Sequence, residues 1–447
     1  MIPRAVFILI ILVGVGVALT TLLNRAAVSN SFSCKNCNVI VISIENLGAK
    51  YTSLFDPTLD TTPFLASLAD QSIVFDHAYV QAPWDFASHV SMFTGRYPWD
   101  LGIWTDKDAI ASSTLTIAKV LRASGYDTAA FSNTALPSQA YRVRAGFDEF
   151  VSKPVPAGTS DIPKIFTEAT SWLSARTDTQ TPFFLFIHPL EVFIPYGSRE
   201  SGTYVSSSEI GAINSQARGP TREEAARSLA GYKEDVRSVD TALKEFFGRL
   251  AASGLRSNTV VIITSGAGAE FGEHGSVGLH AFSLYNESIH VPLMIILPQK
   301  TAKRIGGNVE LRSLPATLLD ILNLPEEPAF EGASLVEAMR TETAPQSISM
   351  AQTGETRSHF LSVYLQNSMA TSVQSVLIPG GARFARTASA VSWPWHALRT
   401  PDGGVHLYRI DTDPSEQQDL GLHPVLSPKD KKLVDELVVK LLLIPSQ

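Results

Sequence analysis

Four uninterrupted apolar runs mark the first part of the chain. They are Val39–Ile44, Thr128–Phe131, Phe183–Ile187 and Thr259–Thr264. Apolar runs of this length, without polar alternation, are typical of strands that are buried on both faces of a parallel sheet. We therefore predict four interior strands.

Between these runs, apolar residues recur at helical spacing. Thr62-Pro63 predicts the start of one helix, residues 114–123 predict a second that ends before Gly125, and Tyr232–Leu250 predicts a third. Strands that alternate with helices predict an α/β fold with a doubly wound, mostly parallel sheet flanked by helices. Ligands of such sheets bind beyond the carboxyl ends of the strands.

After about Pro345 the pattern changes to short alternating runs, such as 360–365 and 405–410, separated by glycine-rich turns. This pattern predicts a small antiparallel subdomain. Ser427-Pro428 predicts the start of a closing helix. Its apolar face would comprise Leu433, Val434, Leu437, Val438, Leu441 and Leu442.

Residues 5–23 form an apolar segment without a charge, preceded by Arg4 and followed by Arg25. The segment is long enough to span a bilayer core, which favours an uncleaved transmembrane anchor. The small residues Gly16 and Ala18 leave a cleaved signal peptide open, in which case the protein would be secreted. Both interpretations predict an extracytoplasmic protein, either periplasmic or at the cell surface.

The predicted organisation has four parts. Residues 1–24 are the anchor, 25–37 a stem with a Cys pair, 38–345 the α/β domain, and 346–447 the small sheet with its closing helix. The chain has only two cysteines, Cys34 and Cys37, which cannot close a structural zinc site alone. Outside the cytosol we expect them to form a disulfide.

Composition narrows the possible functions. The 447 residues are 45% hydrophobic and 18% charged, as in ordinary globular proteins. Lys and Arg number 36 against 43 Asp and Glu, a net charge of −7, and no block of basic residues is present. A nucleic acid is therefore not an expected partner.

Several segments in a fixed order resemble the sulfatase family of the alkaline phosphatase superfamily, in its sulfatase and phosphonate monoester hydrolase-like branch. They are Asn38–Ile42, Thr62–Leu65, Ala82–Pro98, Gly272–Gly275, Leu284–Leu293 and Leu407–Glu416. The resemblance implies a divalent cation, Ca²⁺ or Mg²⁺, held by oxygen ligands. It also implies a nucleophile that is formylglycine or threonine, and hydrolysis of sulfuric, phosphoric or phosphonic esters.

Most catalytic positions of this family are substituted here. Asp85 stands at the nucleophile position, where it can neither become formylglycine nor act as a hydroxyl. The Asp pair of the first strand is Glu45-Asn46, so the candidate metal ligands are Glu45, Asn46 and Asp85. The second metal motif is Gly266-Ala267, whose side chains offer no ligand atom.

The substrate side of the site is partly kept. His89 takes the place of the basic residue beside the nucleophile, and His280 that of a basic residue that contacts substrate, so both are catalytic candidates. Ser88, His188 and Phe193 stand at substrate-binding positions, and Phe193 replaces a histidine. We expect a cleft built by Glu45, Asn46, Asp85, Ser88, His89, Gly266 and His280.

Structural interpretations of single residues remain open at this point. Glu45 could be a solvated or hydrogen-bonded carboxylate, Asp85 could cap the helix that starts there, and His188 could be a core histidine.

The substitutions affect the catalytic positions and leave the residues of the scaffold unchanged. The sequence therefore predicts a membrane-anchored extracytoplasmic protein that is catalytically inactive or strongly impaired. It would keep a cleft for an anionic ester or polysaccharide and bind a divalent cation weakly or not at all. The alternative is an active metal-dependent hydrolase with a site rebuilt from Glu45, Asn46 and Asp85.

Overall fold

The computed structural model describes residues 32–105, 108–133, 144–153, 162–178, 180–190, 192–216, 218–278, 283–344, 347–353, 387–400, 403–421 and 426–444. Within these ranges, no helix combines the length and the apolar character that crossing a membrane requires. The predicted anchor at residues 5–23 and the predicted strand at 360–365 lie outside the described residues.

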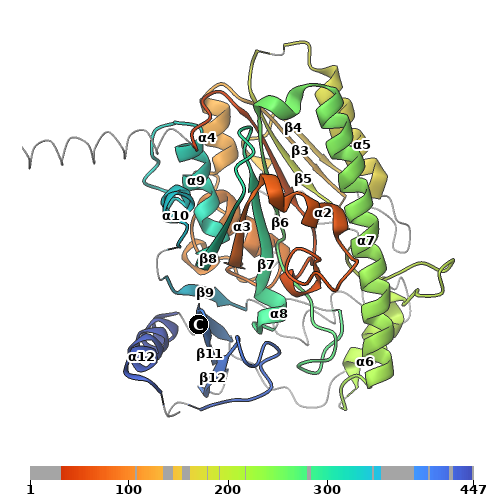
Figure 1. The fold of residues 1–447 in the computed structure, drawn as a ribbon, viewed down its shortest axis with the longest axis vertical. Helices are drawn as coiled ribbons and strands as arrows, with labels where there is room; N and C mark the ends of the chain where they lie inside the picture. The colour runs from red at the N-terminus through yellow and green to blue at the C-terminus, as the bar shows by residue number, and fades with distance from the viewer. Residues whose placement is uncertain are drawn as a thin grey trace, which may run out of the picture.

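The main sheet has eight strands in the order β4-β3-β5-β1-β6-β7-β2-β8 (Figure 1). Their bounds are β1 Asn38–Ser43, β2 Ile73–Tyr79, β3 Asp127–Ser132, β4 Glu149–Ser152, β5 Phe183–His188, β6 Thr259–Thr264, β7 His290–Ile296 and β8 Lys303–Glu310. The four predicted strands correspond to β1, β3, β5 and β6, each to within one residue at either end.

The sheet is mostly parallel, as predicted, and one antiparallel strand makes it a mixed sheet. Strand β7 runs antiparallel to both of its neighbours, β6 and β2. In the described residues between β6 and β7, 265–278 and 283–289, the one helix is the short α8 (Asn286–Ile289), and no long crossover helix is present. Parallel neighbours are usually joined through a crossover helix, so the absence of one from the described part of this connection agrees with the antiparallel direction of β7.

Helices cover both faces of the main sheet, as predicted for a doubly wound fold (Figure 1). Val39 and Val41 of β1 belong to one hydrophobic cluster, and Ile40 and Ile42 to the other, because successive side chains of a strand point to opposite faces. The first cluster includes residues of α3 Asp85–Thr94, α4 Ile117–Ala123, α9 Leu314–Ile321 and α10 Val336–Thr341. The second includes residues of α2 Pro63–Ser67, α5 Ile162–Ala175, α6 Ser207–Ser215 and α7 Arg222–Ala252.

Helix α7 is longer than the predicted segment and begins at Arg222. Thr221 accepts a hydrogen bond from the backbone N–H of Glu224, and the Glu224 side chain accepts one from the backbone N–H of Thr221. This capping box pairs two backbone donors at the helix start. The apolar spacing from Tyr232 onward marks only the part of α7 that faces the core.

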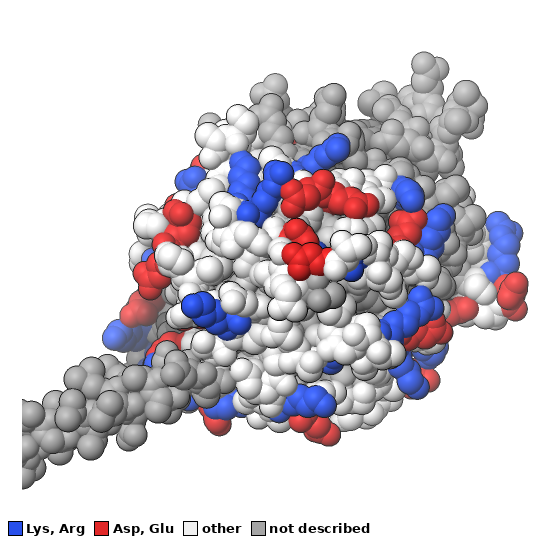
Figure 2. All heavy atoms as spheres, turned by 90° about the horizontal axis from the view of Figure 1, so that it is seen from above, with Lys and Arg blue, Asp and Glu red and all other residues white. Residues whose placement is uncertain are grey.

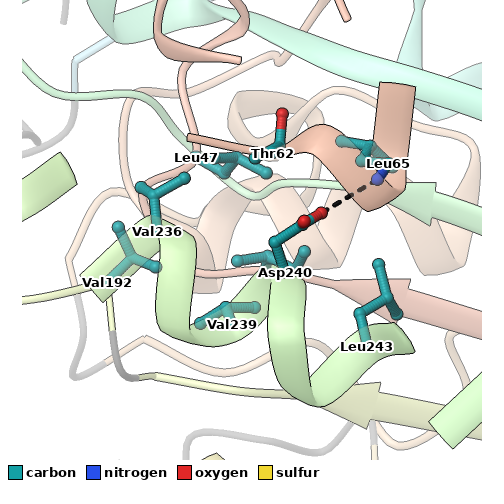
Figure 3. Close-up of a pocket in the computed structure, with 9 residues that line it drawn as sticks. Leu47, Thr62, Leu65, Val192, Val236, Val239, Asp240 and Leu243 are labelled. Carbon is teal, nitrogen blue, oxygen red and sulfur yellow. Dashed lines mark hydrogen bonds between the residues drawn. The ribbon is translucent and has the colours of Figure 1, made fainter. Parts of the chain in front are cut away.

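Helix α2 begins at Pro63 after Thr62, as predicted, but the Thr62 side chain makes no capping hydrogen bond. Asp240 of α7 accepts instead from the backbone N–H groups of Phe64 and Leu65, at 2.8 and 2.9 Å. Figure 3 shows Asp240 at a small pocket whose other lining side chains are mostly apolar. A residue 176 positions away therefore supplies the cap of α2.

The second sheet is antiparallel and has the order β12-β11-β10-β9. Its strands are β9 Ser349–Gln352, β10 Ala388–Ser392, β11 Trp395–Arg399 and β12 Val405–Arg409. Helix α12 (Pro428–Leu443) begins after the predicted N-cap Ser427 and buries Leu433, Val434, Leu437 and Leu441. Leu442, placed on the apolar face from the sequence, is 57% exposed because the buried stripe of α12 is narrower than predicted.

The segment ahead of β1 is joined to the α/β domain. The structure links Cys34 to Cys37 by a disulfide, as expected from the sequence. The backbone N–H of Cys34 donates to the carbonyl of Ile321 at the end of α9. The start of the described chain is thereby fixed against the helical layer.

Charges on the surface are largely compensated. Figure 2 shows one face on which basic and acidic side chains lie interspersed. Ion pairs such as Lys153–Glu168, at 2.7 Å, and Arg237–Asp60, at 2.6 Å, join side chains of opposite sign.

Candidate functional site

The site is built where three neighbouring strands, β5, β1 and β6, end side by side. Ser43, the last residue of β1, lies in register with Thr264, the last residue of β6. Beyond β1, the backbone N–H of Glu45 donates to the carbonyl of Pro189, just after β5. The structure therefore places Glu45 and Gly266 at the same edge of the sheet, as predicted from the topology.

Asp85 reaches this edge from the first turn of α3. It is the first residue of the helix, and the N-cap is Trp84, which makes no side-chain capping bond. The interpretation of Asp85 as the helix cap is therefore wrong, because Asp85 is the first residue inside the helix and Trp84 holds the cap position. A Cβ atom placed on Gly266 would lie 1.9 Å from Asp85 Oδ1, so this oxygen occupies the space that a side chain at position 266 would fill.

Two histidines lie beside Asp85, and Ser43 contacts both of them. The Ser43 hydroxyl is 2.8 Å from His89 Nε2, and its carbonyl is 2.8 Å from His188 Nδ1. The two imidazole rings are edge-on, with centroids 4.6 Å apart. His188 Nε2 lies 3.3 Å from Glu45 Oε2.

These side chains are almost completely buried. The exposed fractions are 2% for Glu45, 5% for Asp85, 0% for His89 and 1% for His188. Burial, with the nearby His188 as a second cause, holds the pKa of His89 well below its usual value, so His89 is neutral at pH 7. The cluster therefore contains two carboxylates and at least one neutral imidazole.

The other predicted site residues are placed as follows. Asn46 has a positive φ of 52° and is fully buried, and its side-chain atoms make no hydrogen bond within the described chain. Ser88 is also fully buried, and its hydroxyl has no hydrogen-bond partner among the described residues. Phe193 packs against the core cluster on the α7 side of the sheet. Ala267 is buried in the loop after β6, and His280 lies outside the described residues.

The sequence analysis missed Ser43. This residue holds His89 through its side chain and His188 through its backbone. Ser43 could have been noticed in the sequence, because it is a polar residue within the apolar run of β1. It stands directly before Ile44 and Glu45, at the carboxyl end of the strand.

The sequence analysis also assigned no role to a second buried cluster of titratable side chains. His274 Nε2 lies 3.7 Å from Glu287 Oε2, and both lie near a carboxylate oxygen of Glu416. Lys50 pairs with Glu287 at 3.0 Å, yet burial raises the pKa of Glu287 to about 7. In the sequence, these residues are marked only by their place in the segments that resemble the family, and that place does not indicate what they do.

Comparison with known proteins decides the family. The sulfatase family model matches residues 37–324, well over half of the chain. The chain belongs to the sulfatase family. It is 23% identical over 330 residues to an ulvan-active sulfatase of Formosa agariphila, and 21% identical over 360 residues to arylsulfatase K of Canis lupus familiaris. These alignments cover 68% and 67% of this chain, and 64% and 65% of the relatives, so the chain spans just under two thirds of each.

Solved structures of the sulfatase fold agree with the architecture. One is described as a complex with its substrate D-glucosamine-2-N,6-O-disulfate; its TM-score is 0.68 at 16% identity, covering 91% of this chain and 97% of the other. Another, the phosphonate monoester hydrolase of Agrobacterium radiobacter, has a TM-score of 0.68 at 15% identity, covering 91% and 95%. At these identities the likeness shows the fold alone.

Sulfatases typically depend on a metal, and the residues present fit a divalent cation. One ligand atom each from Asp85, His89 and His188 lie within 4.8 Å of one another. Asp85 Oδ1, His89 Nδ1 and His188 Nε2 are buried and make no hydrogen bond among the described residues. Buried polar atoms are normally paired, so a cation between them would offset their desolvation.

Proposed function

We propose that this protein binds an anionic ester or sulfated saccharide in a sulfatase fold without hydrolysing it. The observation that carries the proposal is the contact of Asp85 with Gly266, where the carboxylate takes the space of a missing metal-ligand side chain. Asp85 and Gly266, which replace the nucleophile and a metal ligand of the family pattern, thus pack against each other.

The chemistry of Asp85 opposes hydrolysis. A carboxylate cannot serve as a formylglycine or as a threonine hydroxyl, and it would face a sulfate or phosphate of the same charge. Two unit charges ~4 Å apart repel by about 4 kcal/mol at an effective dielectric constant of ~20, so a bound ligand should hold its anionic group away from Asp85, where no attack on the ester can occur. The loss of a donor at Phe193 adds to this, since a single donor to a developing oxyanion is worth roughly 10²- to 10³-fold in rate.

The ligand set disfavours the hard cations that the family resemblance implies. Gly266 and Ala267 offer no side-chain ligand, which leaves Glu45, Asn46 and Asp85 as oxygen donors. Ca²⁺ takes six to eight oxygens, so three side chains would leave most positions to water. We therefore expect Ca²⁺ and Mg²⁺ to bind weakly or not at all.

The ligand class follows from the relatives and remains a proposal. A structural neighbour is described with a disulfated glucosamine, and another with a neocarrahexaose, a saccharide. A sulfated saccharide is therefore the first ligand to test on this chain.

One assay separates binding from hydrolysis. Full-length protein in detergent should turn over aryl sulfate, phosphate and phosphonate esters no faster than a buffer control. Isothermal titration with D-glucosamine-2-N,6-O-disulfate should show binding without release of sulfate. Turnover by the wild type that a chelator inhibits and Asp85→Ala abolishes would overturn the proposal.

An engineered variant tests the same idea from the other side. Asp85→Thr, Gly266→Asp and Ala267→His together restore the side-chain types of the family. Asp85 must change in the same variant, because a side chain at 266 would meet its carboxylate. The triple variant should bind Ca²⁺ more tightly than Gly266→Asp with Ala267→His alone.

A metal-dependent hydrolase is the second candidate, and one observation favours it. Both side-chain atoms of Asn46 and one oxygen of Asp85 are buried without hydrogen bonds in the described structure. With Glu45, these groups could hold a cation in a rebuilt site, which would supply a Lewis acid when bound. The chelator assay above decides between the two candidates.

Export and membrane anchoring complete the proposal and rest on residues 5–23. The protein should sediment with membranes and resist extraction at alkaline pH, and deletion of residues 5–23 should abolish this. Recovery of the intact chain from the soluble cytoplasmic fraction would contradict export.

A further inference from the structure

The two histidines of the site are oriented as metal ligands usually are. His188 Nδ1 lies 2.8 Å from the carbonyl of Ser43, and a carbonyl can only accept, so Nδ1 carries the proton. The lone pair is then on Nε2, which has no hydrogen-bond partner in the described chain and lies 3.3 Å from Glu45 Oε2. A ligating histidine typically donates its other N–H to such a carbonyl.

His89 shows the same division between its ring nitrogens. Nε2 lies 2.8 Å from the Ser43 hydroxyl, which leaves Nδ1 as the nitrogen without a hydrogen bond among the described residues. The Ser43 hydroxyl oxygen can accept the proton of Nε2, and Nδ1 then offers a lone pair. Two imidazole lone pairs and the Asp85 carboxylate therefore face one small volume.

The spacing suits a small tetrahedral ion. Bonds of ~2.0–2.1 Å from zinc to nitrogen and oxygen place neighbouring ligand atoms of a tetrahedron roughly 3.3–3.4 Å apart. The separation between Glu45 Oε2 and His188 Nε2 is 3.3 Å, and the ligand atoms of Asp85, His89 and His188 lie within 4.8 Å of one another. Glu45 lies outside that group of three, so its carboxylate would have to move toward Asp85 and His89 to complete the tetrahedron.

We propose that Glu45, Asp85, His89 and His188 form a closed site for a zinc-like divalent cation. Imidazole favours zinc and other transition metals, whereas Ca²⁺ and Mg²⁺ prefer all-oxygen sites. Four protein ligands fill a tetrahedron and leave no open position for water or substrate, as in structural zinc sites. This inference rests on the proposed function. Asp85, at the nucleophile position, can be a ligand of a closed metal site only in a protein that does not hydrolyse the ester.

The burial of the cluster agrees with a structural ion. Each of the four side chains is at most 5% exposed, so an ion among them would have little contact with solvent. It would join the ends of β1 and β5 to the start of α3. The site would then stabilise the fold where an active sulfatase carries out chemistry.

Metal content of the full-length protein is the first test. Protein purified in detergent without added metal, then dialysed against Zn²⁺ and freed of excess, should retain one equivalent. Replacement by Co²⁺ should give the intense visible absorption of tetrahedral cobalt. Retention of Ca²⁺ in preference to Zn²⁺, or an octahedral cobalt spectrum, would overturn the proposal.

Variants assign the ligands. His188→Gln and Asp85→Asn should each lower Zn²⁺ affinity by more than 100-fold, and Ser43→Ala, which removes the hydrogen bond to His89, by roughly 10- to 100-fold. His77→Gln is the control, since His77 lies in β2, stacks on Trp393 and belongs to neither of the two candidate metal groups of the described chain. It should lower stability without changing Zn²⁺ affinity.

The cobalt spectrum of the wild type needs no variant, so the proposal stays testable even where a substitution prevents folding. Unchanged Zn²⁺ affinity in both His188→Gln and Asp85→Asn would refute the ligand assignment. Ester turnover by zinc-loaded wild type would refute the proposed function, while the cobalt spectrum and the variants would still report on the ligand set.

Discussion

The contact between Asp85 and Gly266 makes a quantitative prediction about Gly266→Ala. The new Cβ would lie 1.9 Å from Asp85 Oδ1, far inside the 3.0 Å that real Cβ contacts keep. Asp85 is 5% exposed, so its carboxylate has little room to move aside. Overpacking of a buried site costs about 1–3 kcal/mol, so the variant should unfold several degrees below the wild type.

A double-mutant cycle identifies the cause of this loss. In the Asp85→Ala background the carboxylate is absent, and Gly266→Ala should then cost at most about 0.5 kcal/mol. The coupling energy between the two positions should therefore be about 1–3 kcal/mol by urea or thermal denaturation. Additive effects at the two positions would show that the carboxylate does not occupy the space above Gly266, and would remove the main support for the proposed function.

Gly248→Ala provides the matched control. Gly248 lies in α7, at an exposed position where an added Cβ would meet nothing within 4 Å. Alanine is the better helix former by about 1 kcal/mol, so this variant should be slightly more stable than the wild type. Its effect should be the same with and without Asp85→Ala.

Three further predictions follow from other parts of the molecule. Burial raises the pKa values of Glu270 and Glu287 to about 7 from the usual 4.5. The free energy of unfolding should therefore fall as pH rises from about 4.5 to about 7. The double variant Glu270→Gln with Glu287→Gln should show a smaller pH dependence in urea titrations. Cys34 and Cys37 should both be oxidised in protein from its native compartment, and free thiols by mass spectrometry after non-reducing isolation would contradict either export or the disulfide. Asp240→Ala should lower stability by about 1–2 kcal/mol, because two backbone N–H groups of α2 lose their acceptor; an unchanged melting temperature would exclude this capping role.

The sequence by itself determined the interior strands and the family. Strands such as β1 and β6 could be predicted because a continuous apolar run is a local pattern and both of their faces are buried. The family could be recognised because its matched segments keep their order along the chain. The substitutions at Asp85, Gly266 and Ala267 could be read in the same way, since each is a matter of residue identity.

The tertiary structure decided how these residues meet. The antiparallel direction of β7 depends on how the chain returns from β6, and the cap of α2 comes from Asp240 on a distant helix. Asp85 on α3 fills the space at Gly266 beyond β6, and Ser43 of β1 holds both histidines of the site. Distances and side-chain directions between residues far apart in the chain arise from the packing of separate elements, and no local pattern of residues specifies them.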